Sequence, residues 1–288
     1  MTILNNTTII IVLYQESDEL VLRSLEKIKN FKIIIFDNAD NKILKNKIIS
    51  KYKIDKYILS KKNVGFSAGY NKAIKFCTTK FIFIKNSDCI IDQNNILKLY
   101  DYLNLDEECM IVSPTSYDKN HNLTFCSDNL PENNSQSRHL DLHGNVCVQS
   151  VLGAAMFMRM NDFKKIEMFN ENLFIYFSDF DLCRKVNYSK KSVVQLFDSI
   201  CVHTHGEIKA KNYFKRVFLR EHYFTLDKLY YFYQINLHDD LINDLQKKIK
   251  NYIFKMILSF FTLNTKDIIK YYSWIYAYFK FKKFLKKN

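Results

Sequence analysis

The sequence contains few of the residues that build sharp turns, with 5 Gly and 2 Pro among 288 residues. All-β domains with many short strands need such residues, so this scarcity argues against a β-sandwich or a barrel. Cysteine occurs seven times, but the number is odd and no two cysteines have CxxC spacing. The sequence therefore favours neither a zinc site nor a disulfide framework, and we expect reduced, buried thiols in a cytosolic protein.

Long apolar runs are also absent. No stretch of 18 or more apolar residues occurs, and the longest candidate, residues 252–263, is interrupted by Lys255. A bilayer-spanning helix is therefore not expected. The chain begins Met-Thr-Ile-Leu-Asn-Asn, without a basic segment ahead of an apolar one, so we expect no signal peptide.

The net charge of +13 is distributed unevenly along the chain. Residues 209–288 contain 17 Lys and Arg against 6 Asp and Glu, which gives +11. Residues 1–208 contain the other 26 basic and 24 acidic residues, which gives +2. The asymmetry predicts an anionic partner for the last part of the chain.

Apolar runs alternate with helical patterns in the first part of the chain. Four runs have the composition of buried parallel strands: residues 8–14, 32–36, 56–59 and 81–84. The β-α-β-α-β order predicts an α/β fold with parallel strands and right-handed crossovers. After a polar, irregular excursion at residues 115–145, further apolar stretches predict strands at residues 146–158, 193–197 and 200–206. The first of these is interrupted by the small residues 153–155.

The strand at residues 81–84 stops abruptly at Asn86 and Asp88. Ligands of open α/β sheets bind at the carboxyl ends of the strands. A carboxylate in that place can hold a divalent cation against a diphosphate, because hard cations prefer oxygen ligands. Taken alone, the same residues could form an Asx turn after a strand.

Five other residues, at three places in the chain, have both a functional and a structural interpretation. Gly65 and Gly69 stand at a loop-to-helix junction, where glycine allows close approach of a ligand or only a turn and tight helix packing. Asp179 stands at a helix start, where an acid can simply favour the helix dipole. His203 and His205 follow an apolar strand, and two histidines there raise the chance of a ligand role.

In their order along the chain, these motifs resemble those of the family 2 glycosyltransferases, in particular the bacterial rhamnosyltransferase-like branch. The resemblance covers residues 7–206. It includes the string Phe-Asn-Glu followed by Phe-Ile-Tyr-Phe-Ser-Asp-Phe-Asp-Leu-Cys, which is similar to the acceptor-side signature of the family. The five matching stretches are residues 12–16, 36–40, 63–71, 84–88 and 153–181.

This resemblance implies a GT-A fold, a Rossmann-like nucleotide-binding α/β sandwich with a mixed sheet, here expected over residues 1–208. It implies Asp179 as the general base and a Mg²⁺ or Mn²⁺ ion bound by Asp88 with His203 or His205. Residues implied to bind the nucleotide-sugar donor are Tyr14, Glu16, Asp37, Asn38, Asn63, Gly65, Gly69, Asn71 and Asn86. Residues implied on the acceptor side are Gly153, Ala154, Tyr176 and Asp181.

The sequence departs from the family pattern at two places. Asn86 stands where many relatives of this fold have Asp. The segment Asn86–Asp88, which we call the metal hook, therefore contains a single carboxylate. Ser178 stands before the predicted base, where the family usually has Glu. The implied reaction is an inverting transfer of rhamnose or another hexose to a glycan or lipid-linked glycan, by metal-assisted direct displacement, in the synthesis of bacterial cell-surface polysaccharide or lipooligosaccharide.

Residues 209–288 interleave aromatic residues with Lys, most densely at residues 230–233 and 270–283. We expect a helical, basic C-terminal region that contacts an anionic membrane surface, at the inner face of the cytoplasmic membrane. The alternative is an ordinary appendage that packs its aromatics inward. Two other functions stay open: a nucleic-acid-binding protein, although no RNP, zinc-finger or helix-turn-helix signature occurs, and a sugar nucleotidyltransferase, although residues 12–17 lack glycine.

Overall fold

The computed structural model describes residues 3–124, 127–133, 143–204 and 213–287. The chain divides into two compact units: Met1–Asn170 with Ser178–Lys209, and Glu171–Phe177 with Ala210–Asn288. Glu171–Phe177 therefore belongs to the second unit, whereas the division predicted from the sequence kept residues 1–208 together. That these units are separate domains stays a prediction.

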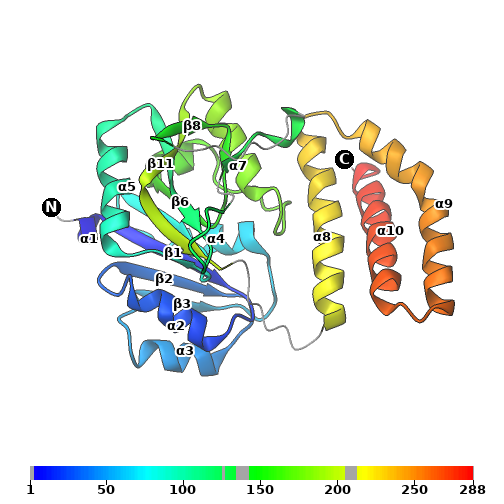
Figure 1. Ribbon diagram of the computed structural model, residues 1–288, viewed down its shortest axis with the longest axis horizontal. Coiled ribbons are helices and arrows are strands. Elements are labelled where there is room, and N and C mark those ends of the chain that lie inside the picture. Colours follow the sequence, from blue (N-terminus) through cyan, green and yellow to red (C-terminus); the bar gives the residue numbers. More distant parts are fainter. Residues whose placement is uncertain (1–2, 125–126, 134–142, 205–212, 288) are drawn as a thin grey trace. The chain divides into compact units, whose positions relative to one another are not determined.

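The first unit begins with a parallel sheet in the order β3-β2-β1-β4 (Figure 1). Its strands coincide with the four predicted runs: β1 (Thr7–Leu13), β2 (Lys32–Asp37), β3 (Lys56–Leu59) and β4 (Phe81–Lys85). The crossovers contain α2 (Asp18–Glu26), α3 (Lys42–Ile49) and α4 (Phe66–Ile74), and a short α1 (Ile3–Asn6) precedes β1. The predicted α/β fold is confirmed.

The sheet continues with antiparallel and parallel pairs. β10 (Ala155–Arg159) runs antiparallel to β4 and to β6 (Cys109–Tyr117), and β6 runs parallel to β11 (Ser192–His203). The end of β11 pairs with β5 (Cys89–Ile90), and its start pairs with β8 (Val146–Val148). The predicted mixed sheet is therefore confirmed. The remaining elements of this unit are α5 (Gln93–Leu105), β7 (Ser127–Asp128), η1 (Pro131–Asn133), β9 (Ser150–Val151), α6 (Met160–Lys165) and α7 (Ser178–Tyr188).

Two strand predictions were wrong in detail. Residues 146–158 form three short strands, because a bend at Gln149 and a turn at residues 152–154 interrupt them. The expected strands at 193–197 and 200–206 are, as far as His203, one strand, β11, whose pairing with β6 shifts register between Leu196 and Ile200; residues 205 and 206 lie outside the described residues.

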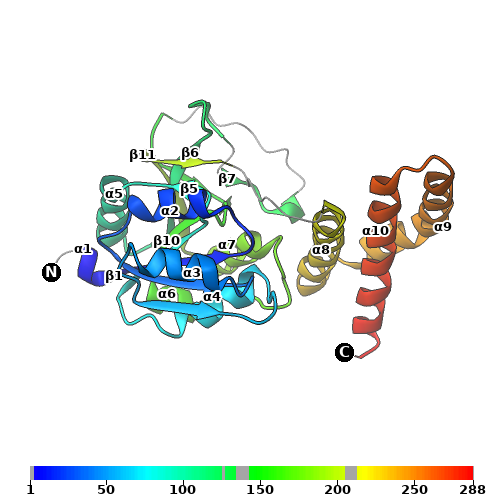
Figure 2. The ribbon, with the colours of Figure 1, turned by 90° about the horizontal axis from the view of Figure 1, so that it is seen from below.

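Apolar layers lie on both faces of the sheet, as the near-continuous apolar strands require. Ile9 and Ile11 of β1 pack in one layer with residues of α2, α3 and α5, and Ile10 packs in the other with residues of α4, α6 and α7. Helices accordingly cover both faces (Figure 2). The loops at the carboxyl ends of β1, β2 and β4 stay uncovered by this packing and supply the candidate site.

The expectation of buried thiols was only partly right. The six described cysteines are free, and Cys89, Cys109, Cys183 and Cys201 are buried. Cys77 is half-buried, however, and Cys147 is exposed. The seventh, Cys126, lies outside the described residues.

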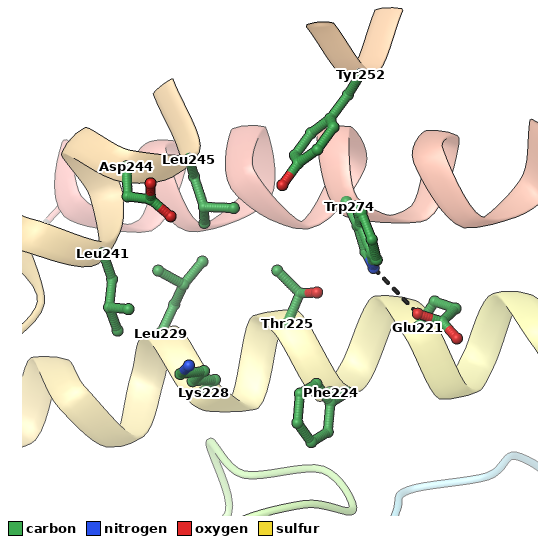
Figure 3. Close-up of a pocket in the computed structure, with 10 residues that line it drawn as sticks. All are labelled: Glu221, Phe224, Thr225, Lys228, Leu229, Leu241, Asp244, Leu245, Tyr252 and Trp274. Carbon is green, nitrogen blue, oxygen red and sulfur yellow. Dashed lines mark hydrogen bonds between the residues drawn. The ribbon is translucent and has the colours of Figure 1, made fainter. Parts of the chain in front are cut away.

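The second unit contains three long helices: α8 (Tyr213–Gln234), α9 (Asp239–Phe261) and α10 (Thr265–Leu285). α10 packs against both other helices, and a pocket of about 260 Å³ lies among the three (Figure 3). In this pocket Trp274 Nε1 donates a hydrogen bond of 3.1 Å to Glu221 Oε2. None of the described helices is long and apolar enough to span a bilayer.

Asp227 on α8 holds the segment Glu171–Phe177 within this unit. Its Oδ2 accepts hydrogen bonds from the backbone N–H groups of Ile175 and Tyr176, at 2.8 and 2.9 Å. The ring of Phe174 stacks on Tyr223, with centroids 3.8 Å apart. Burial raises the pKa of Asp227 to about 6, although these hydrogen bonds and the charge of Lys280 oppose the shift.

This raised pKa predicts that Asp227 makes the protein less stable as pH rises. The folded state binds the proton more tightly than the unfolded chain, so the contribution is present below pH 4 and is lost as pH rises through about 6. The full loss is about 3 kcal/mol. Thermal melts of the wild type and Asp227→Asn between pH 4 and 7.5 measure it. The difference in melting temperature should change across this range, and parallel curves would contradict the assignment.

Candidate functional site

The loop after β1 presents Glu16 at the edge of the sheet. Gln15 adopts a left-handed backbone conformation with φ of 62°, and the chain reverses there so that Glu16 Oε2 accepts a hydrogen bond from Tyr14 N at 2.6 Å. Burial, together with the charges of Asp88 and Asp37, raises the pKa of Glu16 to about 7. Glu16, which was predicted with Tyr14 to bind the nucleotide-sugar donor, therefore lies near Asp37, which ends β2, and Asp88, which follows β4.

Asp37 ends β2 and is 1% exposed. Its Oδ1 accepts from Ala39 N at 2.7 Å, and its Oδ2 accepts from the Tyr57 hydroxyl at 3.0 Å. Burial and the charge of Asp37 raise the pKa of Tyr57, so this hydroxyl stays a donor. The sequence did not single out Tyr57, and its place in the strand beside β2 was the available signal.

A network of amide hydrogen bonds shapes the turn before α4. Asn38 accepts from Val64 N at 2.9 Å and donates to Gly65 O at 3.1 Å. Asn63 accepts from Gly65 N at 2.9 Å. Gly65 has a φ of 88°, a conformation that favours glycine over any residue with a Cβ. These three residues, which the sequence predicted to bind the nucleotide-sugar donor, thus fix the loop between β3 and α4 against the carboxyl end of β2.

Gly69 and Asn71 lie within α4 and are buried. A Cβ on Gly69 would meet Val12 Cγ1 at 3.0 Å, so glycine lets the helix approach β1 closely. The Asn71 side chain donates to Phe169 O at 2.8 Å and accepts from Phe169 N at 3.3 Å. For both residues these contacts favour the structural interpretation over a direct contact with a donor.

The hook after β4 brings Asp88 to His203. The end of β11 pairs with β5 so that His203 lies opposite Cys89, and His203 Nε2 lies 3.3 Å from Asp88 Oδ2. Burial lowers the pKa of His203, but the hydrogen bond and charge of Asp88 outweigh it and leave the pKa raised. Asp88 and His203 are 115 positions apart in the sequence, and the resemblance implied that they bind one metal ion. In the structure they lie close together. His205 lies outside the described residues.

A buried lysine, Lys85, donates a hydrogen bond to the metal hook. Lys85 is 0% exposed, and its ammonium donates to Asn86 O at 3.0 Å and to Ser24 Oγ. The Tyr70 hydroxyl donates to Lys85 O at 3.1 Å. Burial lowers the pKa of Lys85 to about 8. The sequence analysis missed Lys85 and Tyr70, and a charged residue at the end of an apolar run was the only visible signal.

Asp179 stands in the first turn of α7 and points at the turn before β10. Its Oδ2 accepts from Gly153 N at 3.0 Å, and its Oδ1 accepts from Phe180 N at 3.0 Å. Burial raises its pKa in spite of these bonds. The backbone oxygen of Ala154, the residue after Gly153, accepts a hydrogen bond from Asn86 N at 3.0 Å. Adjacent residues 153 and 154 therefore link the predicted base to the predicted metal hook.

The remaining acceptor-side predictions have different surroundings. Asp181 is 0% exposed and forms ion pairs with Arg184 at 2.6 Å and Lys185 at 3.1 Å, which favours a structural role. Tyr176 belongs to the second unit, where its ring contacts Phe224. Ser178, which replaces the usual Glu, is buried and hydrogen-bonds to Ser67 across 2.7 Å.

Asp88 and His203 can together hold a divalent cation. Carboxylate oxygen and imidazole nitrogen are both common ligands of such ions, and the two side chains are 14% and 10% exposed. In the described part of the chain, no group of three or more His, Cys, Asp and Glu could hold a metal ion. The pair therefore fits an ion that takes its other ligands from water and a bound diphosphate.

Two solved structures have a fold similar to that of this chain. GalNAc-T7, in a crystal structure with UDP, GalNAc and Mn²⁺, has a TM-score of 0.57 at 11% identity, covering 78% of this chain and 50% of that chain. The mannosyltransferase PcManGT from Pyrobaculum calidifontis, solved with GDP-Man and Mn²⁺, has a TM-score of 0.51 at 11% identity, covering 76% and 62%. The chain thus spans less than two thirds of either.

No curated protein matches the chain in sequence. The model for "Glycosyl transferase family 2" matches residues 8–167, which include β1 to β4, the Asp88 hook and the turn at Gly153. At these low identities the two structures support the GT-A fold, and the family match rests on the sequence itself. Because the match extends over more than half of its residues, this chain belongs to glycosyl transferase family 2.

Proposed function

We propose that the protein transfers a sugar from a nucleoside diphosphate donor to a hydroxyl group of an acceptor. The observation that carries this proposal is the link through Gly153 and Ala154, which holds the Asp179 carboxylate beside the Asn86–Asp88 hook. A transferase of this kind needs a base and a diphosphate site on opposite sides of one reacting carbon. Family membership and two structural neighbours solved with nucleotides and Mn²⁺ support it.

Asp179 would act as the base in an inverting displacement. The acceptor oxygen forms a bond to the anomeric carbon, the bond from that carbon to the diphosphate oxygen breaks, and the acceptor proton passes to Asp179. Each carboxylate oxygen has two lone pairs, so the bonds from Gly153 and Phe180 leave acceptor capacity for this proton. The raised pKa makes Asp179 a better proton acceptor than an exposed aspartate.

The donor would lie along the carboxyl ends of β1, β2 and β4. Glu16 and Asp37 would face its nucleoside, and Asp88 with His203 would hold Mg²⁺ or Mn²⁺ at its diphosphate. When bound, this ion would neutralise the charge of the departing nucleoside diphosphate. Protonation of Glu16 near neutral pH would reduce its repulsion of the diphosphate, and its pKa of about 7 permits this.

The finer assignments rest on sequence resemblance. We propose rhamnose or another hexose as the transferred sugar and a glycan or lipid-linked glycan of the bacterial surface as the acceptor. We also propose that the protein works at the inner face of the cytoplasmic membrane, where such acceptors are made. The excess of +11 in residues 209–288 supports an anionic surface as its partner.

Calorimetric titration with UDP, GDP and dTDP tests the donor site. We expect at least one of these nucleotides to bind the folded protein with Mn²⁺ present and to bind more weakly after addition of EDTA. The absence of binding for all three in Mn²⁺ would count against a nucleotide-sugar donor.

Gly153→Ala is expected to reduce turnover about tenfold, because small displacements of a catalytic group are costly. A Cβ at this position would lie 3.2 Å from Phe66 Cζ, which is a tight contact, and 3.4 Å from Asp179 Cβ, so either Phe66 or the turn whose Gly153 N holds Asp179 has to shift. Gly144→Ala is the matched control, since nothing lies within 4 Å of its Cβ. Turnover and melting temperature are measured for both variants. Equal turnover in the two would show that the position of Asp179 does not depend on Gly153.

A further inference from the structure

The C-terminal half of α9 exposes a dense set of large apolar residues. Seven of them lie within the last turns of the helix and the residues after it, and each is at least 40% exposed: Ile253, Phe254, Ile257, Leu258, Phe260, Phe261 and Leu263. Phe261 and Leu263 are 83% and 84% exposed. A monomer in water rarely exposes so many large apolar side chains together, so this surface calls for a partner.

The opposite side of the same helical segment already has its packing. Tyr252 contacts Trp274 on α10, with ring centroids 5.0 Å apart, and Ser259 is buried. Residues 253, 254, 257, 258 and 261 recur at the spacing of one helical face. The exposed residues thus form a continuous stripe, which we call the α9 stripe, facing away from α10.

The aromatic stretches singled out in the sequence lie mainly elsewhere. Tyr230 and Tyr233 of α8 pack edge-on against Phe281 and Phe284 of α10, and Tyr278 is buried. Trp274 lines the pocket of Figure 3 and is hydrogen-bonded there. These rings therefore pack inward, which was the alternative to contact with a membrane. Tyr272, Tyr276 and Phe279 of α10 are about half exposed, but the two most exposed large apolar residues of this unit, Phe261 and Leu263, belong to the α9 stripe and its end. From the sequence, residues 252–263 were considered only as a spanning segment.

Lysine supplies nearly all the charge of the segment that contains this stripe. Residues 245–287 contain 11 Lys and no Arg, with Asp267 as the only acid, which gives a charge of +10. Lys250 and Lys255 are exposed on α9 itself, and Lys266 is exposed just after the turn. Apolar side chains flanked by Lys match the depth profile of a bilayer surface, with acyl chains below and anionic headgroups at the level of the ammonium groups.

We propose that the α9 stripe inserts into the surface of an anionic lipid bilayer. The inference refines the membrane location proposed above and identifies the inserting surface. No described helix can span a bilayer, so the stripe would lie in the plane of the interface. The concentrated positive charge favours an anionic bilayer over a second copy of this chain, because two copies facing each other would bring like charges together.

Flotation of the full chain with vesicles made of equal parts phosphatidylglycerol and phosphatidylcholine tests the proposal. The double variant Phe254→Ser with Phe261→Ser is expected to partition roughly 100-fold less, from the lost burial of two rings. Leu105→Ser on α5 is the matched control, since Leu105 is 88% exposed on the first unit. Pure phosphatidylcholine vesicles should bind the wild type weakly.

Equal flotation of the wild type and the double variant would overturn the proposal. So would a dimer in solution that the double variant dissociates, in the absence of vesicle binding by the wild type. Nucleotide binding measured on the same samples separates this inference from the proposed activity, because Phe254 and Phe261 belong to the other compact unit. A double variant that binds nucleotide with wild-type affinity but not vesicles is the expected result.

Discussion

Asp179→Asn is expected to lower kcat by about 1,000-fold while the affinity for the donor stays unchanged. The amide keeps an oxygen that can accept from Gly153 N, so the turn before β10 should keep its position. It cannot take the acceptor proton, however, so the displacement loses its base. Single-turnover kinetics and donor titration on the same preparation separate the two effects.

Asp92→Asn is the appropriate control for this substitution. Asp92 also stands at a helix start, where its side chain accepts from Asn95 N at 2.9 Å, and asparagine is an equally good cap. We expect wild-type kcat and an unchanged melting temperature for this variant. Near-wild-type turnover by Asp179→Asn would remove Asp179 from the chemistry and leave it as a support of the Gly153 turn.

Asp88→Ala is expected to weaken Mn²⁺-dependent binding of the nucleoside diphosphate by more than about tenfold. The hook holds one carboxylate, with an amide at Asn86, so no neighbouring acid in the hook can replace it. His203 would lose the partner that lies 3.3 Å from its Nε2. Calorimetric titration of the nucleotide at several Mn²⁺ concentrations measures the effect.

Asp198→Ala gives the matched control, because Asp198 pairs with Lys98 only at an exposed surface, at 3.7 Å. It should bind nucleotide and Mn²⁺ as the wild type does. If Asp88→Ala keeps both the affinity and its Mn²⁺ dependence, the ion is held elsewhere. The His203→Ala variant then shows whether the histidine alone retains it.

The parallel half of the sheet could be predicted from sequence because its strands are buried on both faces. The apolar runs of β1, β2 and β4 need no knowledge of distant residues. The turn that separates β9 from β10 does need it, since it depends on bonds from Asn86 and to Asp179. The small residues 153–155 marked an interruption of this stretch, but the sequence alone did not show that the chain turns there.

The position of the candidate site was predictable where a polar residue ends a strand or closely follows one, as Asp37 and Asp88 do. It was not predictable where a role depends on which way a side chain faces. Asp179 and Asp181 are two positions apart, yet one meets Gly153 and the other is buried against Arg184. Tyr57 and Lys85 act through neighbours far along the chain, so local pattern gives no sign of them.

In the C-terminal region, the interleaving of aromatics with Lys correctly predicted helices. It could not distinguish rings that pack between α8 and α10 from those that face solvent. The decisive fact is the pairing of α9 with α10, which leaves one face of α9 exposed. That pairing depends on tertiary contacts such as Tyr252 with Trp274.

We propose that this site breaks the bond between a sugar and a nucleoside diphosphate. Release of nucleoside diphosphate can be measured with a panel of UDP-, GDP- and dTDP-sugars, in Mn²⁺ with a bacterial glycolipid extract as acceptor. We expect release from at least one donor by the wild type, and strong loss of that release with EDTA, in Asp88→Ala and in Asp179→Asn. Release that persists in both variants, or folded wild-type protein that binds these nucleotides but never releases product, would contradict it.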